Sequence, residues 1–150
     1  MRSETSTALS PLWDVLPASD QLASSTCELP ARFEAVWEAR QFTRLTLQRW
    51  ELPELLDTVA LVASELVTNA LRHGMTPLAA PVVRLSLARL TSRVVCAVRD
   101  PSSAAPVTRT PDFVAESGRG LHLVASCSET WGWHPLSGAG KVVWALFPTE

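Results

Sequence analysis

A carboxylate and an amide stand one helical turn apart in the stretch PELLDTVALVASELVTNALRHG, which runs from Pro53 to Gly74. Glu65 and Asn69 are four positions apart, so in a helix both side chains leave the same flank, and His73 continues the row. Carboxylate and amide oxygens suit a hard cation and a polarised hydroxyl or water, because both offer lone pairs. The stretch is therefore a candidate site for cation binding and proton transfer.

The same residues also have a plain structural interpretation. A Glu at the edge of an amphipathic helix is usually solvated, a mid-helix Asn is a poor helix former, and a His near a helix end often interacts only with the helix dipole. Further signals are needed to choose between the two. The helix itself is predicted by apolar residues at three- and four-residue steps, namely Leu55, Val59, Val62, Leu66 and Ala70.

A second candidate carboxylate follows a predicted hairpin. Apolar and small or polar residues alternate around residues 83–88, Thr91-Ser92 forms a turn, and Val94 to Val98 reads as a second, mostly apolar strand. The second strand leads into Arg99-Asp100. The pattern therefore places Asp100 at a strand end, where its carboxylate can protrude into a pocket.

The stretch after this hairpin has the composition of a loop. Residues 101–117, PSSAAPVTRTPDFVAES, contain three Pro and no convincing period, which is typical of a lid or binding loop. Gly118-Arg119-Gly120 then opens a short apolar helix that continues with Leu121. Backbone N–H groups in such a turn can approach an anion, and the helix dipole favours phosphate there. A tight turn with no ligand is the alternative interpretation.

The remaining segments complete a helix-and-sheet pattern. An extended piece at Thr26–Leu29 precedes a predicted helix from Ala31 to Trp50, and two strands, Thr130–Trp133 and Val142–Phe147, end the chain. The tryptophans of these last strands are expected to pack within the sheet. Residues 1–25 are rich in Ser, Thr and Pro and are predicted to be a flexible arm, whose apolar cluster could dock on the domain or on a partner. The cluster consists of Leu9, Leu12, Trp13, Val15 and Leu16.

Composition narrows the function classes. With 150 residues, 47% of them hydrophobic, the chain is predicted to form one domain over residues 26–150 that buries a core without staples. A net charge of −2 argues against nucleic-acid binding and favours protein or nucleotide partners. Three distant cysteines without a C-x-x-C pair indicate neither disulfides nor zinc. With no signal peptide or apolar membrane-spanning run, a cytoplasmic location is expected.

The order of these motifs resembles the Bergerat-fold, histidine-kinase-like ATPase superfamily. The resemblance is closest to the bacterial anti-sigma-factor serine/threonine kinases and related ATP-binding regulators, and it extends roughly from Leu29 to Phe147. It rests on SELVTNALRHG together with ESGRGLHLV, and the joint match is far more specific than either piece. The fold it implies is α+β, a two-layer sandwich with a mixed, mainly antiparallel sheet and three helices on one face.

The resemblance also implies roles for individual residues. Asn69 would hold the Mg²⁺ that bridges the ATP phosphates, Glu65 would be the general base, and Asp100 would accept a hydrogen bond from the adenine amino group. Residues 101–118 would form the ATP lid. The other residues expected at the nucleotide are His73, Gly118, Arg119, Gly120 and Leu121.

Two departures from the family pattern stand out. The family's Asp-x-Gly-x-Gly is Asp100-Pro101-Ser102-Ser103-Ala104 here, so close backbone approach to the base is less assured. The Gly-Thr of the last sheet is Gly140-Lys141, which brings in the only lysine of the chain. Lys141 is predicted to meet a phosphate or, as the commoner outcome for such a residue, to be an exposed strand-end lysine.

The function implied is an anti-sigma-type kinase. The resemblance suggests ATP and Mg²⁺ as cofactors, a Ser or Thr of an anti-anti-sigma protein as substrate, a sigma factor as a second partner, and a homodimer as assembly. The missing glycines favour an alternative, a non-catalytic regulator that docks a partner and still binds a nucleotide. A sensor histidine kinase is disfavoured, because no helix pair carrying a phosphoacceptor precedes the ATP-binding unit.

Overall fold

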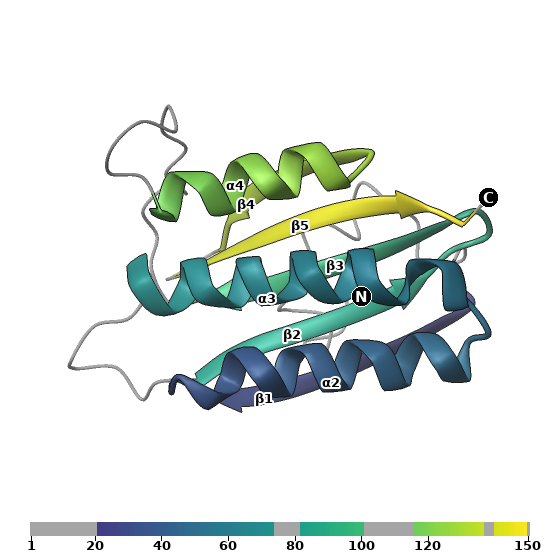
Figure 1. Ribbon diagram of the computed structural model, residues 1–150, viewed down its shortest axis with the longest axis horizontal. Helices are drawn as coiled ribbons and strands as arrows, with labels where there is room; N and C mark the ends of the chain where they lie inside the picture. Colours follow the sequence, from purple (N-terminus) through teal and green to yellow (C-terminus); the bar gives the residue numbers. More distant parts are fainter. Residues whose placement is uncertain (1–20, 74–81, 101–115, 137–139, 150) are drawn as a thin grey trace, which may run out of the picture.

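The computed structural model describes residues 21–73, 82–100, 116–136 and 140–149, with only the backbone of residues 73 and 116–120. Three helices lie side by side over a five-stranded sheet (Figure 1). In chain order the elements are β1 (Ala23–Pro30), α2 (Glu34–Arg49), η3 (Pro53–Leu55), α3 (Leu56–His73), β2 (Val82–Arg89), β3 (Arg93–Asp100), α4 (Glu116–Cys127), β4 (Thr130–Pro135) and β5 (Lys141–Pro148).

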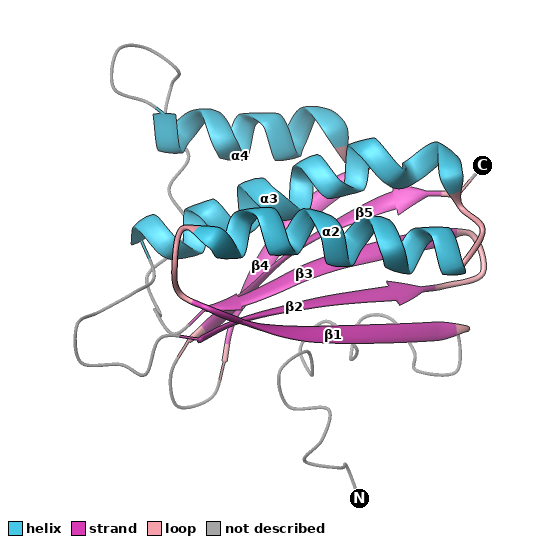
Figure 2. Ribbon diagram, turned by 60° about the horizontal axis from the view of Figure 1, so that its bottom comes forward, coloured by secondary structure: helices cyan, strands magenta, loops and turns pink. Residues whose placement is uncertain are grey.

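The sheet has the strand order β1-β2-β3-β5-β4, and each of its four pairings is antiparallel. The expected two-layer α+β sandwich with three helices on one face is confirmed, and Figure 2 shows all three helices on the same side. The described residues contain no parallel pairing, so the sheet is purely antiparallel where a mixed one was expected. The physical reason is that α4 joins β3 to β4, which pairs with β5 at the far edge rather than parallel to β3.

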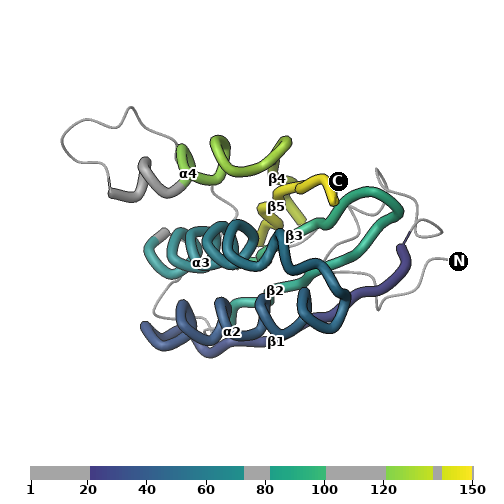
Figure 3. Tube along the Cα trace, turned by 45° about the vertical axis from the view of Figure 1, so that its right-hand side comes forward, coloured from purple at the N-terminus to yellow at the C-terminus, as the bar shows by residue number. Residues whose placement is uncertain are grey.

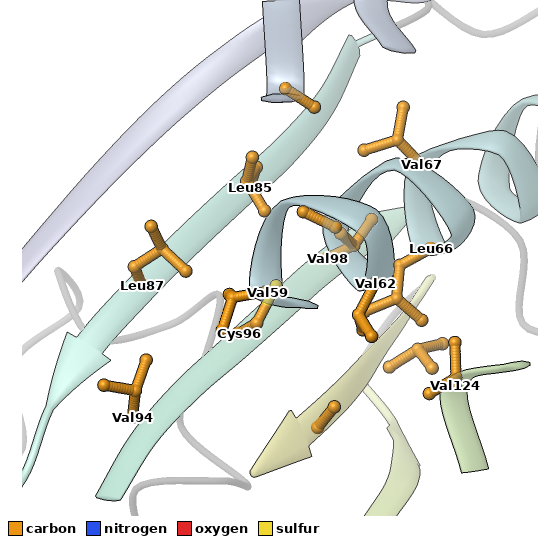
Figure 4. Packing of buried hydrophobic residues seen from close by; sticks show 14 of the residues in the cluster. Val59, Val62, Leu66, Val67, Leu85, Leu87, Val94, Cys96, Val98 and Val124 are labelled. Atoms are coloured by element: carbon orange, nitrogen blue, oxygen red, sulfur yellow. The ribbon is translucent and has the colours of Figure 1, made fainter. Parts of the chain in front are cut away.

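The central helix α3 lies between α2 and α4 (Figure 3). Its apolar stripe is buried against the sheet, where it meets residues of β2 and β3 such as Leu85 and Val98 (Figure 4). Each fully buried Val or Leu contributes about 1.5–3 kcal/mol, so this stripe is a main source of stability. The buried apolar residues of α3 are Val59, Ala60, Val62, Ala63, Leu66, Val67 and Ala70.

Alternation along the strands gives the sheet two distinct faces. Val94, Cys96 and Val98 of β3 belong to the core under the helices, whereas Val95 and Ala97 belong to a second apolar cluster. Because side chains alternate across a strand, this second cluster lies on the face turned away from the helices, which we call the second face. The same alternation puts Val143, Ala145 and Phe147 of β5 under the helices.

Several boundaries differ from the sequence expectation. β1 begins at Ala23, inside the segment assigned to the arm, and residues 1–20 lie outside the described residues. Polar side chains alternate along β1, because only one face of this edge strand meets the core, and they make the strand hard to recognise from the sequence. α4 begins at Glu116, so the last residues of the expected lid are helical, and residues 101–115 lie outside the described residues.

The tryptophans behave as expected. Trp131 and Trp133 pack against the core under the helices, and Trp144 packs against the cluster on the second face. No helix in the described ranges is long and apolar enough to cross a membrane.

The buried thiol of Cys96 provides a test of this core. Burial raises its pKa from 9.0 to about 12, because the thiolate would lie in an apolar environment. We expect Cys96 to resist iodoacetamide at neutral pH while the protein is folded, whereas the partly exposed Cys27 and Cys127 are alkylated. Mass spectrometry of tryptic peptides, with and without denaturant, measures this. Alkylation of Cys96 at the rate of Cys127 in the folded protein would contradict the packing.

The same pKa shift predicts a pH dependence of stability. Between pH 9 and 12 the unfolded chain loses the Cys96 proton while the folded chain keeps it, so the free energy of unfolding falls as pH rises. A Cys96→Val variant should lack this part of the decline in urea titrations.

Candidate functional site

Four elements meet at one end of the molecule. α3 and β3 end there, and β5 and α4 begin there (Figure 1). The register of the central strands fixes this end at the level of the side chains, because Asp100, the last residue of β3, is directly opposite Lys141, the first residue of β5. The elements that carry the predicted site residues therefore converge, although they are distant in the sequence.

The polar row on α3 lies on the flank that faces α4. Figure 4 shows Val62 and Leu66 on the side of α3 nearer to Val124 of α4. Asn69 follows Val62 by seven residues, about two helical turns, so it continues the same side. Glu65 precedes Asn69 by one turn. Asn69 thus lies on the flank of α3 that faces α4, with Glu65 one turn before it.

The Asn69 side chain is buried to 6% exposure, and its Oδ1 is buried without a hydrogen-bond partner. An unsatisfied buried carbonyl oxygen costs about 1–3 kcal/mol, so such an atom needs a reason to be there. An amide oxygen is a ligand that Mg²⁺ accepts, usually together with waters and phosphate oxygens. The orphaned Oδ1 therefore fits the role expected of Asn69, and the partly buried Glu65 lies one turn away on the same flank.

Asp100 and Lys141 form a buried ion pair. Lys141 Nζ donates to Asp100 Oδ1 at 3.0 Å, and the two side chains are only 2% and 3% exposed. Asp100 shares the parity of Val98, and Lys141 shares that of Val143, so both lie on the face under the helices. The carboxylate expected to receive the base is thus already engaged by a cation.

This pairing changes the interpretation of Lys141. The alternative of an exposed strand-end lysine is wrong, because Lys141 is buried, and the structure shows its ammonium on Asp100. The reason is register: antiparallel pairing of β3 with β5 sets the two residues side by side on one face. Both residues could be identified from the sequence as candidate site residues, but their contact could not. The only signal was that each stands at the end of a predicted central strand.

The other expected residues surround this end. His73 is the last residue of α3, and Gly118, Arg119 and Gly120 lie in the first two turns of α4, where the backbone describes a helix and not a preceding turn. Leu121, one residue after Gly120, is buried at 1% exposure. The first backbone N–H groups of an α-helix have no partner within the helix, and Gly118 lies in the first turn of α4, where such groups are suited to an anion.

A family model for the histidine kinase-like ATPase domain matches residues 29–147. The chain belongs to this family. The match spans nearly the whole domain, from the end of β1 to the end of β5, and membership implies ATP binding. No curated protein matches the chain significantly.

Among solved structures, the ATPase domain is similar to a chain from the crystal structure of the SiaB–SiaC complex from Pseudomonas aeruginosa. The TM-score is 0.61 at 16% identity, and the superposition covers 97% of this chain and 100% of that one. At this identity the likeness establishes the fold alone, and it agrees with the family match. In the described ranges no group of three or more His, Cys, Asp or Glu side chains could hold a metal by itself. A Mg²⁺ held mainly by phosphates and one amide is consistent with that.

The ion pair gives a stability prediction. Lys141→Met leaves the Asp100 carboxylate buried without its cation, and breaking a buried pair on one side costs about 3–5 kcal/mol. We expect this loss in urea unfolding. The double variant Asp100→Leu/Lys141→Met should recover most of it, because neither charge remains.

The matched control is the exposed pair Arg84–Glu28, with side chains 35% and 58% exposed and atoms 2.7 Å apart. Arg84→Met should cost less than about 1 kcal/mol, because solvent screens an exposed pair. Equal losses in Lys141→Met and Arg84→Met would contradict the burial of the first pair.

Proposed function

We propose that this ATPase domain is a protein kinase that transfers the γ-phosphoryl group of ATP to a Ser or Thr of a small protein antagonist of the anti-anti-sigma type. The observation that carries the proposal is the row on α3. Glu65 lies one turn from Asn69, whose buried Oδ1 has no hydrogen-bond partner, and the family to which the chain belongs is one of ATPase domains.

Each residue has a part in the transfer. Asn69 would hold Mg²⁺, which supplies charge neutralisation between the β- and γ-phosphates. Glu65 accepts the proton of the substrate hydroxyl as the new O–P bond forms, and the bond from the γ-phosphorus to the bridging oxygen breaks, so that ADP leaves. The N–H groups at the start of α4 orient the phosphates and stabilise their charge.

Two observations favour a protein as the partner of this domain. The similar solved structure is a complex of two proteins, which supports a protein rather than a small molecule as the second substrate. The net charge of −2 disfavours a nucleic acid. The likeness to anti-sigma kinases points to an anti-anti-sigma protein as phosphoacceptor, with a sigma factor as the competing partner.

The kinase activity can be tested with radiolabelled ATP, Mg²⁺ and candidate antagonist proteins. We expect phosphate on a Ser or Thr of one antagonist, and a loss of at least 100-fold in Glu65→Gln, because general-base catalysis contributes about that much or more. Glu54→Gln is the matched control, since Glu54 is exposed in the turn before α3 and should leave the rate unchanged. ATP binding without transfer to any antagonist would refute the kinase proposal.

A variant of Asn69 distinguishes an effect on Mg²⁺-dependent ATP binding from an effect on stability. Asn69→Leu removes an unsatisfied buried oxygen, so it should raise the free energy of unfolding by about 1 kcal/mol while abolishing Mg²⁺-dependent ATP binding in calorimetric titration. The control is Thr68→Val on the same helix. Its hydroxyl donates to the Ser64 carbonyl at 2.7 Å, so this variant should lose stability and keep ATP binding. Unchanged binding in Asn69→Leu would remove Asn69 from the metal site.

A second function is favoured by the ion pair. Because Lys141 donates to Asp100, adenine must compete with Lys141 for the Asp100 carboxylate. The residues that follow, Pro101-Ser102-Ser103-Ala104, lack the family's glycines. A non-catalytic regulator that docks the same partner needs no tight ATP site. Partner binding that is indifferent to ATP, Mg²⁺ and Glu65→Gln would establish this alternative in place of the kinase.

A further inference from the structure

The second face of the sheet is buried where nothing described covers it. Val95, Ala97 and Val142 are 0–1% exposed on this face, over β3 and β5. The three helices lie on the opposite side (Figure 2). A two-layer sandwich should leave this face in contact with water, as antiparallel sheets commonly do. Another part of the chain must therefore exclude water from it.

On β1, the side chains of the second face are exposed, in contrast to those on β3 and β5. Ser24, Thr26 and Glu28 alternate with the core residues of β1 and are exposed. Neighbouring strands alone therefore do not bury a side chain on this face. The composition changes with the exposure: the face is polar over β1, where Thr26 hydrogen-bonds Ser86 at 2.9 Å, and apolar over β3 and β5. Ser86 on the neighbouring β2 is only 4% exposed, so the cover leaves β1 open and extends over β2 and over the apolar half on β3 and β5.

Aromatic packing at this half fits a permanent cover. A Cβ on Gly132 would lie 2.7 Å from the Trp144 ring, so the indole lies close over the β4 backbone. His134 stacks on Trp144 with ring centroids 6.1 Å apart and planes 16° apart. Trp144 Nε1 and His134 Nε2 are both buried without a hydrogen-bond partner, although water would hydrogen-bond both at an open face.

The position at which each remaining segment joins the described part of the chain indicates which segment covers the second face. The Leu22 N–H donates to the Arg89 carbonyl at 2.7 Å, so residues 1–20 adjoin the described part beside the buried Ala88 and Leu90 of the second cluster. The stretches 74–81 and 101–115 leave from α3 and β3 at the opposite end of the sheet, and 137–139 is three residues long. Only residues 1–20 combine the position, the length and an apolar cluster.

We propose that residues 9–16 pack across β3 and β5 on the second face and form a third layer of the domain. The apolar cluster Leu9, Leu12, Trp13, Val15 and Leu16 would supply the cover. Reach is sufficient, because strands are spaced by about 4.8 Å and an extended chain spans about 3.3 Å per residue. The arm is then an integral part of the fold, and this conclusion is independent of the nucleotide chemistry on the other face.

A photocrosslinking residue tests the contact in the full-length protein. Benzoylphenylalanine in place of Trp13 should crosslink within one chain to peptides carrying Val95, Ala97, Trp144 or Leu146. The same probe in place of Leu22, which is 63% exposed, should not reach them. Crosslinks to the helices, crosslinks only between two copies, or no crosslink would each overturn the proposal.

Stability supplies a second measurement that needs no probe. Trp13→Ser and Leu12→Ser should lower Tm by several degrees and increase binding of a hydrophobic dye, because they uncover the apolar half of the second face. Leu22→Ser is the matched control and should change neither. If Trp13→Ser and Leu22→Ser have the same Tm as the natural sequence, the arm does not cover the face.

Discussion

The antiparallel register between β3 and β5 is the constraint on which the site depends. It sets Asp100 opposite Lys141 at the end of the two central strands, on the face that the helices cover. A shift of β5 by one residue would turn Lys141 to the apolar second face and away from Asp100. The pair therefore links register to the site: the arrangement that buries the core side chains of β3 and β5 is also the one in which both charges are neutralised.

The ion pair also affects how strongly Asp100 could accept a hydrogen bond from a base. A carboxylate already accepting from an ammonium at 3.0 Å is a weaker acceptor for the adenine amino group than an uncompensated one. A ligand must either share the carboxylate with Lys141 or displace the cation, which is expensive at 2–3% exposure. In the proposed site this cost would fall on recognition of the base, and it would not act at Asn69 and the start of α4, where we propose that the phosphates bind. Lys141 would then lower the affinity for the base without lowering the competence for phosphoryl transfer.

Much of this arrangement could be predicted from the sequence, and the reason is periodicity. α3 has a regular apolar stripe, β2 alternates and β3 is mostly apolar, so the helix with Glu65 and the strand end with Asp100 were both predicted close to their observed positions. The family match over residues 29–147 agrees with the extent of the resemblance. β1 was predicted only in part, as the extended piece Thr26–Leu29, because its outer face is polar and its first residues resemble the Ser-rich arm.

What could not be predicted depends on contacts between distant segments. Strand order decides that Lys141 meets Asp100, and no local pattern encodes which strands are neighbours. The second face is a similar case. Ala97 and Val142 were expected simply as strand residues, and only their near-zero exposure shows that the sheet is covered on both sides. The Ser- and Pro-rich composition of the arm predicts flexibility. Its apolar cluster suggests a docking site only once a buried apolar face of the sheet is known.

The two faces of the sheet are built on opposite principles. The helix side contains polar groups that stability alone would not select: an amide oxygen without a partner, a partly buried carboxylate and a buried ion pair, all at one end. The second face is apolar where it is covered and polar where it is open. Unsatisfied polar groups in an otherwise consistent fold tend to mark function, because the rest of the sequence must offset their cost. The long buried stripe of α3 contributes that stability and offsets the cost of the Asn69 oxygen, which has no hydrogen-bond partner and which we propose as a ligand of Mg²⁺.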